Sequence, residues 1–174
     1  MQIIRRYAGF CVFVLALIVP FSVTANGQGK QNYEVLAETA LTRVVPTSFY
    51  FAGQSAETQM RNAAAARIGK DRYIIAALVD TSGYSTEISG KYEGFFITDS
   101  PVVIGNKLLG TGAYGFGFSA NGRVNLFDLS SKQILSVATA NDPEMKRPRP
   151  LLMVSTDKGI RLYKGKNYVL IAAR

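Results

Sequence analysis

The chain has 174 residues with one cysteine, no histidine and no tryptophan, and its formal net charge is +8 at pH 7. Without histidine it cannot form Ser-His-Asp or Cys-His nucleophile systems, and its single cysteine cannot supply the sets of His and Cys ligands on which zinc, copper and haem sites depend. Non-catalytic binding and carboxylate chemistry remain open, and no cofactor or metal is expected.

The first 25 residues have the pattern of a secretory signal peptide. Arg5 and Arg6 form a positive start, an uncharged apolar stretch runs over residues 7–19, and Val23-Thr24-Ala25 is a small-residue cleavage site. This pattern predicts cleavage near Ala25-Asn26 and a secreted or periplasmic protein. An uncleaved membrane anchor is the alternative, although the 17 residues from 7 to 23 are at the lower limit for a spanning helix and contain a proline.

Cleavage would also remove Cys11, so the mature domain must be stable without a disulfide. We expect a flexible leader over residues 26–40 and a single domain over residues 41–174, which is long enough to bury a core. Within this stretch, residues 34–45 fit either a helix or an extended segment, and residues 48–51 predict a short strand.

Residues 55–68 predict the one helix of the domain. Ser55 is a suitable N-cap, Gly69 a suitable stop, and Met60, Ala64 and Ile68 form an apolar stripe at helical spacing. Four consecutive alanines make this helix thin, so we expect it to pack closely against a sheet.

From residue 72 onward the patterns are those of strands. The uninterrupted apolar run at 74–79 is typical of a strand covered on both faces, and Asn121-Gly122 is a strong signal for a type I′ hairpin turn. Further short strands are expected at 92–98, 102–104, 107–109, 112–119, 123–129, 133–139, 151–156, 160–164 and 167–173. Short segments at this spacing predict a mainly β fold, an antiparallel meander forming a small barrel or sandwich.

Alternation in the strand 112–119 places aromatic side chains on one face and Gly115 and Gly117 on the other. The glycines suggest close approach of another backbone, for which the helix 55–68 is our candidate. Residues 110–115 match G-x-G-x-x-G, but a strand rather than a helix follows, which is the wrong context for a dinucleotide site.

The aromatic residues either fill the core or line a pocket for a small apolar or aromatic ligand inside the barrel. The candidate ligand-binding residues are Tyr114, Phe116, Phe118, Phe96 and Tyr50.

Positive charge is concentrated at the end of the chain. Residues 145–174 hold eight basic residues and one acid, whereas residues 26–144 hold 10 basic and 11 acidic residues. These cations are either solvated strand positions or a patch for an anionic partner such as phospholipid head groups or acidic polysaccharide. The candidate anion-contacting residues are Lys146, Arg147, Arg149, Arg161 and Lys164.

The sequence is compatible with three alternative functions. The first is a secreted, non-catalytic domain that binds a small apolar ligand or acts as an envelope-associated binding module. The second is a basic-surface protein that docks on an anionic envelope polymer or lipid, with no nucleic acid as partner and with membrane association through the basic region or an uncleaved signal. The third is a carboxylate-based polysaccharide hydrolase or lyase that uses a pair among Asp80, Glu87, Glu93 and Asp99. The missing residue types favour binding over catalysis.

Overall fold

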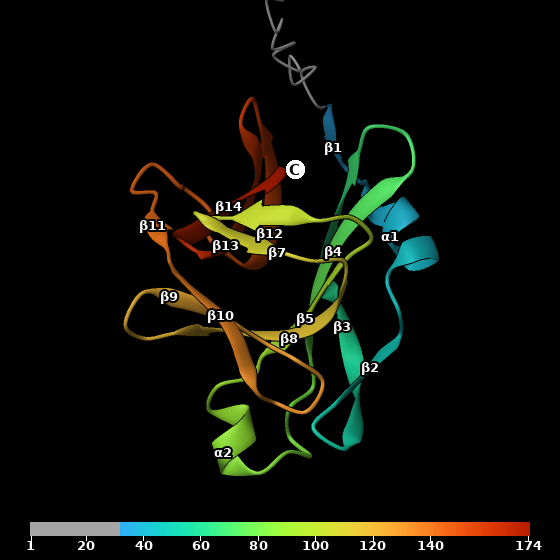
Figure 1. Ribbon diagram of the computed structural model, residues 1–174, viewed down its shortest axis with the longest axis vertical. Coiled ribbons are helices and arrows are strands. Elements are labelled where there is room, and N and C mark those ends of the chain that lie inside the picture. Colours follow the sequence, from blue (N-terminus) through green and yellow to red (C-terminus); the bar gives the residue numbers. More distant parts are fainter. Residues whose placement is uncertain (1–31) are drawn as a thin grey trace, which may run out of the picture.

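The protein is described by a computed structural model over residues 32–174, so the predicted signal peptide lies outside the described residues. Within them the chain forms two antiparallel sheets and two short helices, and the prediction of a mainly β antiparallel fold is confirmed (Figure 1). The helices are α1 (Glu38–Val44) and α2 (Thr86–Ser89).

The first sheet has the order β1-β3-β4-β5-β8-β9-β10, with β2 paired to β3. Its strands are β1 (Tyr33–Val35), β2 (Ser48–Phe51), β3 (Gln54–Ile68), β4 (Arg72–Val79), β5 (Gly94–Thr98), β8 (Gly112–Ser119), β9 (Arg123–Phe127) and β10 (Gln133–Ala138). It is a meander with one excursion, because β5 and β8 are neighbours although the β6–β7 hairpin lies between them in the chain.

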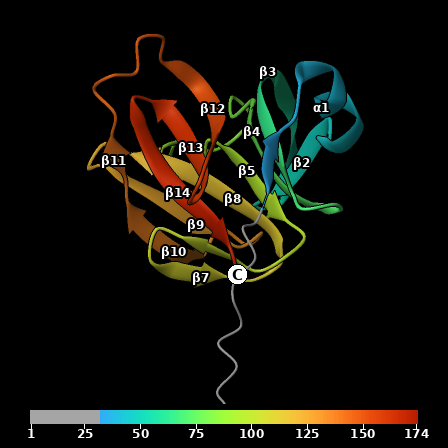
Figure 2. The same cartoon turned by 90° about the horizontal axis from the view of Figure 1, so that it is seen from above.

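The second sheet has the order β12-β13-β14-β6-β7, with β11 paired to β14. Its strands are β6 (Val102–Ile104), β7 (Lys107–Leu109), β11 (Ala140–Asn141), β12 (Arg149–Thr156), β13 (Gly159–Gly165) and β14 (Asn167–Ala173). Figure 2 shows β13 and β14 lying across β8 and β9 of the first sheet.

The main core lies between the two sheets, where residues such as Phe96, Phe116, Leu162 and Ile171 are buried together. The sheets meet at a seam where the Ser155 hydroxyl donates a hydrogen bond to the Tyr33 carbonyl oxygen at 2.8 Å. No backbone ladder joins the sheets in the part of the chain that the structure describes, so they form a sandwich-like arrangement that does not close into a barrel.

A second core covers the opposite face of the first sheet, under α1 and β2. Its centre is aromatic: Phe51 stacks on Tyr92 with ring centroids 4.0 Å apart, and Phe49 stacks on Phe95 at 4.8 Å. Strand β4 therefore has buried residues on both faces, as its apolar run predicted.

The predicted helix over residues 55–68 is wrong, because this segment is the 15-residue strand β3. Alanine has the highest intrinsic helix propensity, but tertiary pairing overrides propensity. Ala64 and Ala66 belong to the main core and Ala65 belongs to the second core, so both faces of this strand are covered. Strands β1 and β4 form backbone hydrogen bonds with its two edges.

Part of the expected leader over residues 26–40 has secondary structure where the structure describes it. Tyr33–Val35 is strand β1, paired with β3, and α1 already begins at Glu38. The Tyr33 hydroxyl accepts a hydrogen bond from the Ala173 backbone N–H at 2.9 Å, which ties the start of the domain to its last strand.

The glycine face of β8 does meet close neighbours, but not the ones expected. A Cβ at Gly115 would overlap the ring of Phe51, and a Cβ at Gly117 would overlap the carbonyl oxygen of Lys91. Backbone and ring therefore occupy the space for which the sequence suggested a helix.

Candidate functional site

The predicted aromatic ligand site is part of the core. Phe96 and Phe116 are each 1% exposed, and Tyr114 and Phe118 pack against the same cluster. The space beside Phe96 and Phe116 amounts to about 10 Å³, room for a single water at most. Tyr50 lies apart from them, 57% exposed on β2. The structure therefore does not bring the five aromatic residues together around a ligand-sized cavity.

Two grooves open beside the basic residues instead. The first, which we call the Arg149 groove, has a volume of about 670 Å³. It is lined by Phe118, Ser119, Ala120, Thr139, Pro148, Arg149, Pro150, Lys164, Gly165 and Asn167. It thus combines two of the predicted anion-contacting residues with prolines and one aromatic ring.

Lys164 is held in place at this groove by a carboxylate from the other sheet. Its Nζ forms an ion pair with Glu93 Oε1, and Glu93 Oε2 accepts a hydrogen bond from the Phe118 backbone N–H at 2.9 Å. The charge of Lys164 is therefore already paired, and Arg149 is the cation of this groove that is exposed to solvent.

The second groove, which we call the Arg161 groove, has a volume of about 520 Å³. It is lined by Gly105, Ala138, Ala140, Thr156, Asp157, Lys158, Arg161, Tyr168, Val169 and Leu170. Small side chains form one wall, and the polar turn between β12 and β13 forms another.

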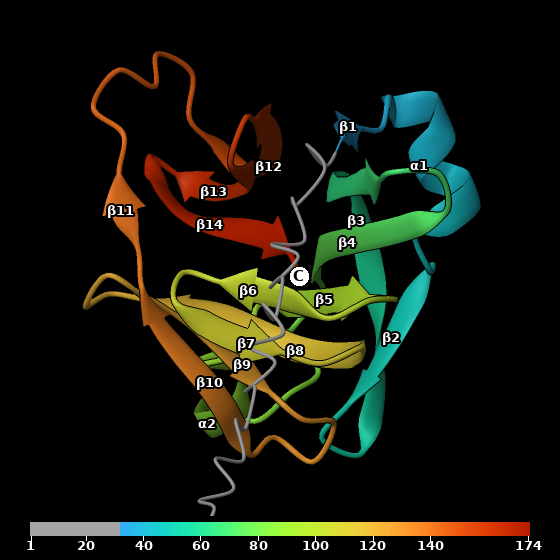
Figure 3. The same cartoon turned by 45° about the horizontal axis from the view of Figure 1, so that its top comes forward.

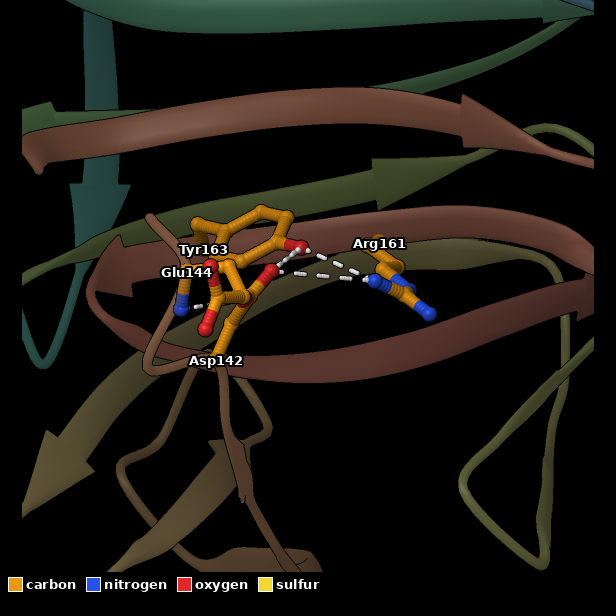
Figure 4. Close-up of polar contacts among 4 residues, drawn as sticks. All are labelled: Asp142, Glu144, Arg161 and Tyr163. Carbon is orange, nitrogen blue, oxygen red and sulfur yellow. Dashed lines mark hydrogen bonds and ion pairs between the residues drawn. The ribbon is translucent and has the colours of Figure 1, made fainter. Parts of the chain in front are cut away.

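Arg161 is fixed at this groove by three contacts. Its Nη1 donates to the Tyr163 hydroxyl oxygen at 3.2 Å and lies 3.8 Å from Asp142 Oδ2, and its guanidinium carbon lies 4.6 Å from the centre of the Tyr168 ring. The Tyr163 hydroxyl in turn donates to Asp142 Oδ2 at 2.8 Å. Figure 4 shows one nitrogen of the guanidinium directed at these partners and another pointing away from them.

This arrangement follows from the register of the second sheet. Arg161 and Tyr163 are two residues apart on β13, so they share its outer face, while Ile160 and Leu162 enter the core. Tyr168 is the cross-strand partner of Tyr163 on β14. Asp142 follows β11, and its backbone N–H donates to the Lys166 carbonyl oxygen at 2.9 Å, which brings its carboxylate to this face.

The electrostatics keep this cluster in one charge state. The hydrogen bond to Tyr163 raises the pKa of Arg161 further above its ordinary value, so the guanidinium stays charged. Burial raises the pKa of Tyr163, so its hydroxyl stays protonated at neutral pH and can donate to Asp142.

Lys146 and Arg147 lie in the exposed loop between β11 and β12, residues 142–148, which we call the basic loop (Figure 3). In the described part of the chain neither side chain has a carboxylate partner. The loop begins at Asp142, the partner of Arg161, and leads into Arg149. It therefore links the two grooves.

The four acids considered for hydrolysis are held by separate partners. Asp80 accepts from the Ser82 N–H, Asp99 from the Tyr73 N–H, and Glu93 pairs with Lys164. Glu87, exposed on α2, pairs with Lys91. The contacts of these acids join no two of them, so the structure offers no observation in favour of a catalytic pair.

Of the residues at the Arg161 groove, sequence reasoning identified Arg161 but missed Asp142, Tyr163 and Tyr168. The alternation of the last two strands could have placed Arg161 and Tyr163 on one face. Nothing local could have found Asp142, because its position depends on the β11–β14 pairing.

Among residues 32–174 no group of three His, Cys, Asp or Glu side chains is arranged to hold a metal ion, and neither helix is long and apolar enough to cross a membrane. No family model, curated protein or solved structure matches this chain.

Proposed function

We propose that this protein is a secreted or periplasmic, non-catalytic binding protein that holds an acidic polysaccharide against its basic region. We define the basic region as the basic loop, the Arg149 groove and the Arg161 groove. The observation that carries the proposal is the placement of the C-terminal cations. Lys146 and Arg147 are exposed on the basic loop, and Arg149 is exposed where this loop enters β12 and lines one of the two open grooves.

The shape of the region favours a polymer chain over a membrane surface. Membrane-surface binding combines basic residues with large apolar side chains that enter the lipid. The exposed large apolar residues of the described chain are Tyr50, Leu108, Leu129, Ile134 and Val154. None of them lies in the basic loop. Two open grooves of several hundred Å³ with scattered polar groups suit a segment of a saccharide chain better than they suit a lipid surface.

The filled interior supports this proposal over binding of a small apolar ligand. Two spaces of several hundred Å³ lie at the surface beside cations, whereas the space beside the buried aromatics is about 10 Å³. An apolar ligand in the interior would have to displace packed core side chains, which costs free energy. Binding at the surface does not carry this cost.

Binding to an acidic polysaccharide such as polygalacturonate, measured by calorimetry, tests the proposal. Affinity should fall steeply between low and physiological salt, because exposed charges are screened. Replacement of Arg147 and Arg149 by Glu should weaken binding at least about tenfold. The matched control reverses Arg43 on α1 and Lys70 in the β3–β4 turn, both exposed, and should leave affinity nearly unchanged.

Three outcomes would contradict the proposal. Binding that does not depend on salt would exclude an electrostatic contact, and equal losses in the two double variants would show a general charge effect. Tighter binding to vesicles with anionic lipids than to the polysaccharide would assign the basic region to a membrane instead.

A further inference from the structure

We propose that the Arg161 groove is a carboxylate-binding site that takes the uronate group of an acidic sugar. This inference deepens the proposed function, on which it rests, by naming the chemical group that the basic region recognises.

The first support is the free edge of the guanidinium. Within the described residues, the polar contacts of Arg161 with Tyr163 and Asp142 both involve Nη1, and its side chain is 38% exposed. The Nη2 and Nε edge therefore presents two parallel N–H donors to the groove. Two such donors match the two oxygens of a carboxylate in a bidentate contact.

The second support is preorganisation. A free arginine loses much conformational freedom when it binds an anion, and a side chain that is already held loses less. Here Tyr168 holds the plane of the guanidinium from one face, while Tyr163 and Asp142 hold Nη1. Asp142 is itself fixed, since its Oδ1 accepts a hydrogen bond from the Glu144 backbone N–H at 3.2 Å.

The third support is the composition of the groove, which suits a sugar acid better than a phosphate group. Lys158 adds a second positive charge, but Asp157 also lines the groove and disfavours a dianion. The Thr156 hydroxyl oxygen, which accepts from the Lys158 backbone N–H, has a second lone pair that can accept a hydrogen bond from a sugar hydroxyl. The small residues Gly105, Ala138 and Ala140 leave room for the ring.

The experiment titrates the folded protein with methyl β-D-glucuronoside and follows the Nε–Hε signals of arginine side chains and the backbone amides by NMR. The neutral methyl β-D-glucoside is the matched ligand control, and sulfate tests for a general oxyanion site. We expect the glucuronoside alone to shift the Arg161 Nε–Hε signal together with amides of residues 156–161.

Variants test the role of the two parallel N–H donors of Arg161. Arg161→Lys keeps the charge but loses the two parallel donors, so affinity for the glucuronoside should fall about tenfold or more. Tyr163→Phe removes the hydroxyl that holds Nη1 and should weaken binding less, as expected for a positioning residue. Arg43→Lys, at an exposed site on α1, is the control and should bind like the native protein.

The wild-type titration needs no variant, so a variant that fails to fold does not prevent the test. No shift at Arg161 with the glucuronoside, or an equal response to sulfate, overturns the carboxylate site. If the monomer binds at Arg161 but the polymer does not bind in a salt-dependent way, the inference stands and the proposed function fails. If the polymer binds in a salt-dependent way and Arg161→Lys has no effect on binding of the glucuronoside, the proposed function stands and the carboxylate site at Arg161 fails.

Discussion

Gly117 on β8 lies where the backbone at Lys91 passes directly over the strand. A methyl group at this position would overlap the Lys91 carbonyl oxygen, and a backbone atom cannot rotate away as the end of a flexible side chain can. We therefore expect Gly117→Ala to lower the free energy of unfolding by about 1–3 kcal/mol. Denaturant unfolding measures the loss. Gly83→Ala, where a Cβ meets nothing within 4 Å, should change stability little, and equal losses would contradict the explanation.

Tyr92 is a fully buried residue whose hydroxyl makes no hydrogen bond of good geometry among the described residues, although the Tyr84 hydroxyl lies close enough to interact with it. An unsatisfied buried polar group costs about 1–3 kcal/mol. Tyr92→Phe keeps the stacking on Phe51 and removes this cost, so we expect the variant to be at least as stable as the native protein at neutral pH. Urea unfolding at pH 7 tests this, with Tyr50→Phe at an exposed position as the control. A clear loss of stability in Tyr92→Phe would show that the hydroxyl has a partner in solution.

The same residue predicts a dependence on alkaline pH. Burial raises the pKa of Tyr92 above the ordinary tyrosine value, so the folded state holds the phenolic proton more tightly than the unfolded state. The contribution of this protonated hydroxyl to the free energy of unfolding is complete below about pH 10, the ordinary tyrosine pKa. This contribution is lost as pH rises above that value. Stability measured from pH 8 to 11 should therefore fall less steeply in Tyr92→Phe than in the native protein, and identical slopes would contradict this.

At the scale of single elements, β3 shows a conflict between local propensity and pairing. Because residues 54–68 form a strand, a substitution that favours strands should stabilise it at an exposed position. Glu57→Thr should raise the free energy of unfolding by about 0.5 kcal/mol. The matched control is Glu38→Thr in the first turn of α1, which should lower it by about the same amount, since an acid there favours the helix. Loss of stability in both variants would indicate that residue 57 lies in a helix.

The elements that the sequence predicts well are those set by short-range signals. The hairpin that Asn121-Gly122 predicts connects β8 and β9, with Gly122 at a φ of +71°. The type I′ turn is wrong, because Asn121 lacks the positive φ that this turn requires at both central residues. The alternation of Phe116 with its flanking glycines is likewise local and is confirmed. The strand at 54–68 could not be recognised, because its alanines are small enough for either structure and only the pairing with β1 and β4 selects the strand.

Some residues of the candidate site could be predicted from the sequence, and others could not. Arg149, Arg161 and Lys164 stand out in the sequence by charge alone, and all three line grooves in the structure. The residues that orient them come from distant segments: Glu93 reaches Lys164 across the sandwich, and Asp142 reaches Arg161 through the β11–β14 pairing. Such partners are set by topology, which local patterns do not encode.

At the scale of the whole molecule, the two cores share the first sheet, so neither can be lost alone. Phe116 lies in the main core and Phe95 in the second, on strands that pair with each other. We expect Phe116→Ala and Phe95→Ala each to lower the free energy of unfolding by about 3–5 kcal/mol and to shift one common transition. Near- and far-ultraviolet circular dichroism should give the same midpoint for each variant. Separate transitions would show that the cores unfold independently.

The Tyr33 hydroxyl reaches the backbone of Ala173, so the start of β1 lies within the reach of a short linker from the end of β14. A circular permutant should therefore fold, with a short Gly-Ser linker from Ala173 to Tyr33 and new ends in the exposed β3–β4 turn at Gly69-Lys70. Every strand pair would survive, and the basic region would keep its shape. The order in which the strands leave the ribosome could thus be rearranged without redesign of the sandwich.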